Sequence, residues 1–328
     1  MAARCVGIAA LGAYVPPHIL TNADLEKMVD TSDEWIVERT GIRERRIASE
    51  GTATSDLAIE AGKVCLQNAR VKPEEVDLII VASASPDYMF PATACIVQHA
   101  LGASKAAAFD IEIGCTGFIY AMVTGAQFIS SGVYDKVLVI GAETLSRLVN
   151  WRDRNTCCLF GDGAGAALLT PAHGGAGILG FDLGVDGKSS SLLSLPAGGA
   201  RNPASDKTVR EMMHYIHMDG RAVFKFAVKI MGESIAELLK KCGKETDEID
   251  LLVPHQANIR IIESACARFR ISMEKVMVNI ANYGNTSSAS VPLALWEAKG
   301  SGRAKEGDLV VLTAFGAGLS WGSVAVIL

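Results

Sequence analysis

One cysteine of the chain stands where a nucleophile would be expected, at a junction between a strand pattern and a helix pattern. Apolar residues alternate over residues 109–113, which is typical of a strand, and Gly114 ends the alternation. From Phe118 onward apolar residues recur every three or four positions, which predicts a helix. Cys115 would then lie in the first helical turn, where backbone N–H groups and the helix dipole favour a thiolate and lower the thiol pKa. A buried cysteine with no catalytic role is the alternative.

Three segments of the second half add groups that acyl-transfer chemistry uses. His255 follows one apolar strand pattern, Asn285 lies in a Gly-Asn-Thr-Ser turn after another, and Gly316 and Gly318 follow the last long strand pattern. Catalytic groups of α/β sheets lie at such strand ends. Each segment also has a structural alternative: a strand-end histidine, a helix cap, or a glycine turn. Together they offer an imidazole, an amide donor and backbone N–H groups for an oxyanion, which thioester acyl transfer requires beside a thiol.

A similar order of elements occurs twice along the chain. Strand patterns at 76–82 and 136–141 correspond to those at 249–253 and 309–313, about 173 residues later. Such buried strands, alternating with helices, predict an α/β fold with parallel sheets covered on both faces. The halves, residues 1–173 and 174–328, would meet near residue 173, and Cys115 would face the Asn285 turn across a shared cleft. Further strands are predicted at 4–10 and 276–280, a strand-like run at Cys157–Cys158, and helices at 21–26, 31–39, 54–70, 93–101 and 259–269.

Composition excludes several classes of protein. The 328 residues suffice for two domains or one large α/β unit, and 49% of them are hydrophobic. The net charge of −5 argues against nucleic acid as the main partner, although a local basic patch for an acidic partner remains open. No apolar run approaches the ~20 residues that span a membrane, and the first residues lack a signal peptide pattern, so we expect a cytoplasmic enzyme. The eight cysteines form no Cys-x-x-Cys pair, which argues against a zinc or disulfide framework.

Two further motifs bear on ligands. Trp35 and Arg39, four residues apart, share a helix face and could meet a nucleotide or phosphate, or form an ordinary core edge beside a solvated arginine. The glycine-rich run 161–165 precedes a strand pattern instead of opening a helix, so it fails the fingerprint of a nicotinamide-dependent oxidoreductase. The local sequence of a papain-like cysteine protease is also absent.

The motifs around these residues resemble the β-ketoacyl-[acyl-carrier-protein] synthase III family, condensing enzymes of the thiolase superfamily. The resemblance covers essentially the whole chain and is most specific where His-Gln-Ala-Asn and Gly-Asn-Thr-Ser accompany the cysteine. It implies a thiolase-like five-layer αβαβα fold made of two duplicated halves. The matching segments are 33–36, 39–42, 115–118, 160–165, 253–258, 283–287 and 316–318.

The resemblance implies an initiating enzyme of type II fatty acid synthesis. Cys115 would take a short acyl group from acetyl-CoA or another short acyl-CoA and condense it with malonyl-acyl-carrier protein with loss of CO2. His255 and Asn285 would stabilise the enolate, and the N–H groups of Cys115 and Ala317 the oxyanion. We expect no cofactor, no bound metal and a homodimer, with neither nucleic acid nor membrane as partner. The other implied contacts are Thr31, Trp35, Arg39, Arg154, Gly220, Phe224, Ala257 and Asn258 for CoA and pantetheine, Phe90 from the partner subunit for the acyl pocket, and Lys225, Gln256 and Arg260 for the carrier protein.

Two positions depart from the family pattern, and one alternative function stays open. Ala317 stands where glycine is common, which matters little because a backbone N–H acts there. Glu112 is unusual near the nucleophile, and we expect it to be buried with a partner or capped by backbone. A related condensing enzyme or acyltransferase of secondary metabolism could keep all three catalytic residues, whereas plant-type polyketide synthases, thiolases and elongation synthases fit less well. Phe90 suggests a primer of two to four carbons, but the sequence leaves its identity open.

Overall fold

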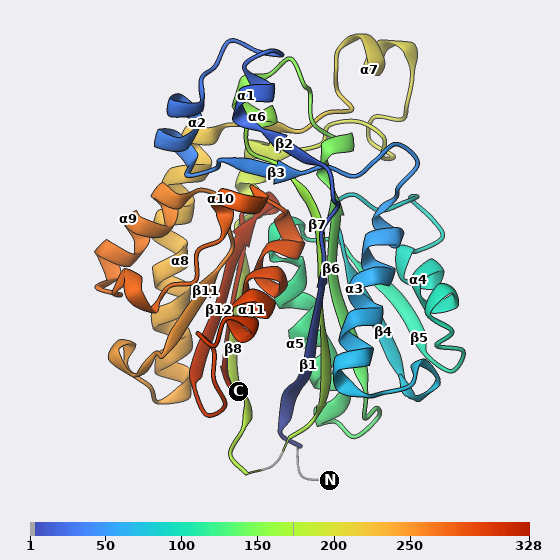
Figure 1. Ribbon diagram of the computed structural model, residues 1–328, viewed down its shortest axis with the longest axis vertical. Coiled ribbons are helices and arrows are strands. Elements are labelled where there is room, and N and C mark those ends of the chain that lie inside the picture. The colour runs from blue at the N-terminus through green and yellow to red at the C-terminus, as the bar shows by residue number, and fades with distance from the viewer. Residues whose placement is uncertain (1–3, 173) are drawn as a thin grey trace.

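The computed structural model describes residues 4–172 and 174–328, so the predicted meeting point at residue 173 lies outside the described residues. Two sheets organise them (Figure 1). The first has the strand order β1-β7-β6-β4-β5 and the second the order β8-β13-β12-β11. Their strands are β1 (Val6–Tyr14), β4 (Leu78–Ala82), β5 (Ala107–Ile111), β6 (Val137–Thr144), β7 (Asp162–Pro171), β8 (Gly177–Val185), β11 (Leu251–Pro254), β12 (Leu309–Gly316) and β13 (Ser320–Ile327).

The two sheets repeat one topology, as the duplicated sequence pattern predicts. In each, a parallel part (β6-β4-β5, or β12-β11) continues into antiparallel strands (β7 and β1, or β13 and β8). The prediction of parallel sheets is therefore correct only in part. β13 turns back on β12 after a single short turn, and so short a connection permits only antiparallel pairing.

Helices and sheets form five layers. Helices α3 (Thr54–Ala69) and α4 (Thr93–Leu101) cover the outer face of the first sheet, and α8 (Gly220–Cys242) and α9 (Ile259–Phe269) cover that of the second. Helices α5 (Gly117–Ser130) and α11 (Ser290–Gly300) lie between the sheets and contact strands of both (Figure 1). The expected αβαβα architecture is confirmed.

The central helices are apolar on nearly every side because each faces two sheets. Phe118 and Met122 of α5 and Leu295 of α11 are fully buried in one cluster with residues of both sheets. Each such side chain contributes roughly 1.5–3 kcal/mol by leaving water. This central core fixes the positions of the two turns that precede α5 and α11.

The shorter elements surround the end of the molecule where the parallel strands finish. Figure 1 shows β2, β3, α1, α2, α6 and α7 at this end. The short helices and strands are α1 (Asn22–Leu25), α2 (Asp33–Thr40), α6 (Arg154–Cys157), α7 (Asp206–Arg210), α10 (Ile280–Tyr283), β2 (Ile19–Thr21), β3 (Glu44–Arg46), β9 (Leu193–Ser194) and β10 (His217–Met218). Short 3-10 turns cover Pro73–Glu75, Gly114–Thr116, Leu145–Arg147, Gly187–Leu192, Thr246–Glu248, Met273–Lys275, Ser287–Ala289 and Ala317–Leu319.

Two predicted strands are not formed. Of residues 276–280, only Val276 makes a strand bridge, to Leu252. The Gln256 side chain binds the backbone beyond that point, at Met277 and Asn279, in place of a neighbouring strand. The strand-like run at Cys157–Cys158 is instead the end of α6. In the described part of the chain, no helix is both long enough and apolar enough to span a membrane.

Candidate active site

Cys115 lies in the 3-10 turn Gly114–Thr116, which connects β5 to α5. The strand-to-helix turn predicted from the sequence is therefore confirmed. Gly114 has a φ of 55°, in the left-handed region that favours glycine. This turn packs directly on the last residue of β12, because a Cβ added at Gly316 would lie only 2.7 Å from the Cys115 nitrogen. A Cβ at Gly114 would likewise lie 3.1 Å from the nitrogen of Ala317, so both proposed oxyanion donors belong to one contact between turns.

Burial governs the ionisation of the Cys115 thiol. Burial raises its pKa to about 12, the nearby Ser287 side chain lowers it, and the Glu143 carboxyl raises it further. The backbone N–H at this turn does lower the pKa, as expected of a helix N-terminus, but the net shift is upward because loss of solvent outweighs the favourable groups. The thiol is protonated at neutral pH, so its attack on a thioester requires a group that accepts its proton.

His255 directly follows β11, at the predicted strand end. Its Nδ1 lies 2.6 Å from the Ser290 hydroxyl oxygen, which also accepts a hydrogen bond of 3.4 Å from the Gln256 N–H. The Ser290 hydroxyl is therefore free to donate its own hydrogen to Nδ1, and we assign the ring proton to Nε2 on that basis. Burial lowers the pKa of His255 to about 3, so the imidazole is neutral and can donate through Nε2.

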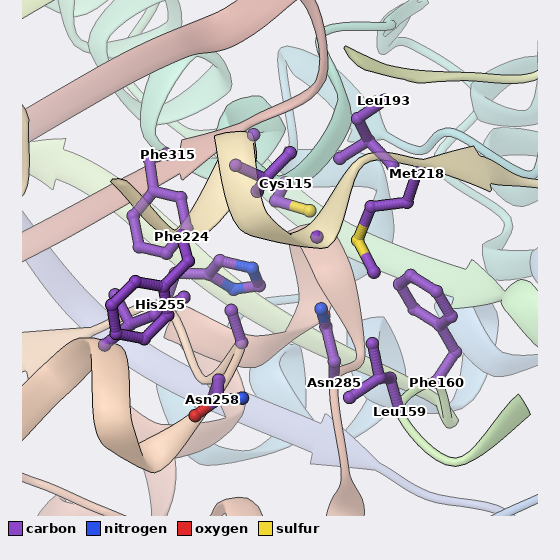
Figure 2. Close-up of a pocket in the computed structure, with 15 residues that line it drawn as sticks. Cys115, Leu159, Phe160, Leu193, Met218, Phe224, His255, Asn258, Asn285 and Phe315 are labelled. Atoms are coloured by element: carbon purple, nitrogen blue, oxygen red, sulfur yellow. The ribbon is translucent and has the colours of Figure 1, made fainter. Parts of the chain in front are cut away.

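Asn285 is fixed by its neighbours on both sides. Its side-chain oxygen accepts a hydrogen bond of 2.9 Å from the Ser287 N–H, which leaves the amide NH2 to point elsewhere. Its backbone pairs with the segment after α6: the Asn285 N–H donates to the Leu159 carbonyl (2.8 Å) and its carbonyl accepts from Gly161 (3.0 Å). Figure 2 shows the amide nitrogen directed into the same space as the Cys115 sulfur and the His255 ring.

These three residues line one cavity of about 130 Å³. Its other walls are mainly apolar and come from the first turns of α8 and α9, from β12 and from the segment before β7 (Figure 2). Four residues that we predicted to contact pantetheine line it as well: Gly220, Phe224, Ala257 and Asn258. A thiol, a neutral imidazole and an amide donor thus face one enclosed apolar space, which suits reactions through an enolate or a tetrahedral oxyanion.

A second cavity, of about 410 Å³, adjoins the first and shares Gly220 and Asn258 with it. Trp35, Arg39 and Arg154 line this second cavity, as predicted for a nucleotide site. The Arg154 guanidinium carbon lies 5.0 Å from the Trp35 ring centre, and that of Arg39 lies 5.9 Å from it. Thr31, also predicted here, is not among the residues that line either cavity in the described ranges, and its buried hydroxyl oxygen has no partner there.

A third cavity, of about 110 Å³, lies on another side of Cys115. Aliphatic side chains form most of its wall: Leu145, Leu148, Leu193, Leu195 and Ile216. This set could not be predicted from the sequence, since these residues lie in loops, a 3-10 turn and the two-residue strand β9, none of which shows a helix or strand period. Phe90 does not line it and is 85% exposed, beside the exposed Tyr88 and Met89.

Two predictions about polar residues are wrong. Glu112 is exposed and lines the third cavity, because it lies beyond the end of edge strand β5 and the strand alternation no longer sets its direction. Gln256 is buried, and its amide binds the carbonyls of Pro254 and Met277, so it is not available to a carrier protein. Lys225 and Arg260 are exposed, as a docking role requires.

Sequence reasoning also missed the buried polar residues that support the site. Glu143 lies near the end of an otherwise apolar strand, and Ser287 and Ser290 lie in a run of small residues that leads into α11. An acidic residue near the end of an apolar strand pattern is the one feature of the sequence that could have indicated the role of Glu143. Among residues 4–172 and 174–328, no group of three or more His, Cys, Asp or Glu side chains is placed to bind a metal ion.

Comparison with known proteins identifies the family. The model of 3-oxoacyl-[acyl-carrier-protein] synthase III matches residues 109–187, and that of its C-terminal part matches residues 239–328. The chain is 57% identical over 320 residues to the beta-ketoacyl-[acyl-carrier-protein] synthase III of Caldanaerobacter subterraneus, covering 98% of this chain and 97% of that protein. The chain belongs to the synthase III family. The resemblance noted from the motifs is therefore confirmed.

Solved structures agree with this assignment to the synthase III family. The crystal structure of 3-oxoacyl-[acyl-carrier-protein] synthase III from Aquifex aeolicus has a TM-score of 0.91 and 48% identity, covering 98% of this chain and 100% of that one. The priming beta-ketosynthase of the R1128 polyketide biosynthetic pathway has a TM-score of 0.92 but only 32% identity, covering 99% and 97%. The fold is common to both, while the sequence is closer to the synthase III enzyme.

Proposed function

We propose that this synthase III enzyme starts fatty acid chains by a decarboxylative Claisen condensation. A short acyl group, acetyl in the simplest case, passes from acyl-CoA to Cys115 and is condensed with malonyl-acyl-carrier protein. The products are 3-oxoacyl-acyl-carrier protein, CoA and CO2. The observation that supports this most strongly is the cavity lined jointly by Cys115, His255 and Asn285, which come from three separate parts of the sequence.

In the first half-reaction Cys115 is the nucleophile. Its sulfur attacks the thioester carbonyl of acyl-CoA, and the oxygen becomes negatively charged. The N–H groups of Cys115 and Ala317 would donate to that oxygen, and the direct contact between their turns supports this role. Collapse of the intermediate breaks the bond to the CoA sulfur and leaves an acyl-cysteine. The proton that the Cys115 thiol loses is taken up by the departing CoA sulfur, which leaves as CoA thiol.

In the second half-reaction the malonyl thioester loses CO2. The electron pair of the broken bond moves into the thioester as an enolate, whose oxygen needs hydrogen-bond donors. His255 Nε2–H and the Asn285 NH2 would supply two neutral donors, and both keep their protons because a neutral imidazole and an amide are far weaker acids than an enol. The enolate carbon then attacks the acyl-cysteine carbonyl, and the Cys115 thiolate leaves.

The cavities suggest how the substrates are arranged. The nucleotide of CoA would occupy the cavity at Trp35, Arg39 and Arg154, and its pantetheine arm the narrow cavity between Gly220 and Asn258. In the free protein Arg154 covers the Trp35 ring, so an adenine between them requires this arginine to move aside. The exposed Lys225 and Arg260 would meet the acidic carrier protein, while Thr31 has weaker support for a contact with CoA.

The third cavity is the best candidate for the acyl chain, because it is aliphatic and reaches Cys115. We propose that the enzyme acts as a homodimer in the cytoplasm, without a cofactor or metal, and that Phe90 of each subunit closes the acyl cavity of its partner. The exposure of three consecutive large apolar residues, Tyr88, Met89 and Phe90, supports an interface at this loop. A small cavity closed in this way would favour a primer of two to four carbons.

Mass spectrometry after exposure to a panel of acyl-CoAs tests this function. We expect a short acyl adduct on Cys115, absent from Cys115→Ala, and 3-oxoacyl product when malonyl-acyl-carrier protein is added. Asn285→Ala should still form the adduct but lose decarboxylation by about 100-fold or more, because one enolate donor is removed. Normal decarboxylation in that variant would contradict the role of the amide.

The same panel examines the alternative, a condensing enzyme of secondary metabolism. An enzyme of that kind would prefer a different acyl donor or a carrier protein from another pathway. Its support is the structural likeness to the R1128 priming ketosynthase, whose TM-score of 0.92 is similar to that of the Aquifex aeolicus synthase III (0.91), although its sequence identity of 32% is lower than 48%. Faster turnover with the fatty acid carrier protein than with a polyketide carrier protein favours the primary function.

A further inference from the structure

A fully buried guanidinium group belongs to the short strand β3, close to the turn that carries Asn285. Arg45 has no exposed surface, and in the described part of the chain no carboxylate forms an ion pair with it. Burial lowers the pKa of Arg45 to about 10, so the side chain keeps its charge at neutral pH. A buried cation is costly unless hydrogen bonds replace its water, so the groups that accept from Arg45 show which segments it holds.

The Arg45 guanidinium binds two parts of the chain that are distant in sequence. Its Nη1 donates to the Leu20 carbonyl (3.2 Å) and to the side-chain oxygen of Asn22 (2.9 Å). Its Nη2 donates to the carbonyl of Cys158 (2.8 Å), the residue that follows α6. Hydrogen bonds from a charged donor are stronger than those between neutral groups, so Arg45 fixes Cys158 relative to the β2–β3 pair.

The segment that begins at Cys158 also holds the backbone of Asn285. Leu159 accepts a hydrogen bond from the Asn285 N–H (2.8 Å), and Gly161 donates one to the Asn285 carbonyl (3.0 Å). Phe160, between them, lies opposite Asn285 in an isolated parallel bridge and lines the catalytic cavity. Because Asn285 lies in no regular strand, these two hydrogen bonds determine where its backbone lies and hence where its amide points.

The aliphatic part of Arg45 packs on both sides of the same bridge. A Cβ added at Gly161 would lie 3.0 Å from the Arg45 Cβ, and one added at Gly284 would lie 3.2 Å from it. Gly284 directly precedes Asn285, so Arg45 contacts the two strands of the bridge as well as binding Cys158. Within the described ranges, Arg45 lines none of the three cavities around Cys115 and the nucleotide site. Its influence on the reaction must therefore pass through the bridge.

We propose that Arg45 positions the Asn285 amide for the condensation half-reaction, by fixing the segment from Cys158 to Gly161 that holds the Asn285 backbone. Arg45 does not touch the substrate, so it is a positioning residue. The inference rests on the proposed function, because it requires Asn285 to be a donor to the enolate. A purely structural role, in which Arg45 only fastens β3 to the rest of the molecule, is the competing explanation and would affect both half-reactions alike.

The experiment measures the two half-reactions separately in wild type and in Arg45→Met. Acetylation of Cys115 by saturating acetyl-CoA is followed by rapid quenching and mass spectrometry. Decarboxylation is followed as CO2 release when malonyl-acyl-carrier protein is added to the acetylated enzyme. In Arg45→Met, decarboxylation should fall about ten-fold or more, because a small displacement of a donor is sufficient for such a loss. Acetylation, which does not use the Asn285 amide, should stay within about three-fold of wild type.

Arg46→Met is the matched control on the same strand. The Arg46 guanidinium pairs with Glu44 (3.2 Å), also on β3, and is only partly buried. This variant removes an arginine of β3 without removing the hydrogen bond to Cys158. Both half-reactions should therefore keep their wild-type rates in Arg46→Met.

A double-mutant cycle with Asn285→Ala determines whether Arg45 acts through the amide. If it does, adding Arg45→Met to Asn285→Ala should slow decarboxylation by less than about two-fold more, because the positioned group is already absent. Arg45→Lys keeps the charge but lacks the planar fork that binds acceptors on two sides, so its loss should be intermediate. If Arg45→Met does not fold, the same cycle is measured with Arg45→Lys.

The outcomes separate this inference from the proposed function. Equal losses in the two half-reactions, unchanged decarboxylation in the Arg45 variant, or a full further loss on top of Asn285→Ala would each overturn the positioning role alone. A wild-type enzyme that forms no acyl adduct on Cys115 or releases no CO2 would refute the proposed function, and the inference with it.

Discussion

Burial is the dominant influence on both ionisable side chains of the proposed triad, and it acts in opposite directions. It raises the pKa of Cys115 to about 12 and lowers that of His255 to about 3, because each group loses solvent around its charged form. The uncharged forms are suited to a cavity that must stabilise a transient anion. The negative charge on the reacting oxygen is then stabilised by neutral hydrogen-bond donors, and not by a positively charged side chain of the triad.

The lowered pKa of His255 predicts a dependence of stability on pH. The unfolded chain binds a proton at His255 below about pH 6.5, whereas the folded chain does so only below about 3. Stability from this residue is complete above about pH 6.5 and falls as the pH decreases toward 3. Urea unfolding at pH 7.5 and pH 5 should show a loss in wild type that exceeds the loss in His255→Gln by about 2 kcal/mol. Equal losses in the two proteins would show that the imidazole is not buried in the neutral form.

At the scale of elements, the contact between two turns controls the geometry around the sulfur. A methyl group at Gly316 would lie 2.7 Å from the Cys115 nitrogen and 2.9 Å from its Cβ, too close for either turn to stay in place. Gly316→Ala should therefore reduce condensation at least ten-fold and lower the melting temperature, because the two oxyanion donors separate. Gly300→Ala is the control, since a Cβ there meets nothing within 4 Å. Full activity in Gly316→Ala would place the oxyanion site elsewhere.

Elements with a strong apolar period could be predicted from the sequence. Segments whose backbone is fixed by side chains from distant parts of the sequence could not. The helices at 93–101 and 259–269 have the predicted bounds, because their apolar faces and terminal residues are local features of the sequence. The segment 276–280 fails as a strand because Gln256, distant in sequence, binds its backbone. The triad residues could be found from motifs, whereas Ser287 and Glu143 depend on contacts between the halves.

At the scale of the whole molecule, the exposed loop at Phe90 predicts an association of two subunits. If the partner's Phe90 closes the acyl cavity, Phe90→Ala should keep acetyl-CoA as a substrate and increase kcat/KM for hexanoyl-CoA by about ten-fold or more. Val133→Ala, which removes another exposed apolar side chain (62% exposed), should leave this ratio unchanged. Sedimentation of wild type should give a dimer. If Phe90→Ala is dimeric and its preference for acetyl-CoA over hexanoyl-CoA is unchanged, the loop at Phe90 does not select the primer.

The sandwiching of α5 and α11 between both sheets has a consequence for how the chain can be divided. Each of these helices belongs to one half of the sequence, yet each packs on strands of both. A fragment that ends or begins near residue 173 would expose to water the apolar face that its inner helix and its sheet bury against the other half. Two such fragments should therefore precipitate or stay unfolded apart and regain activity by complementation when they are refolded together.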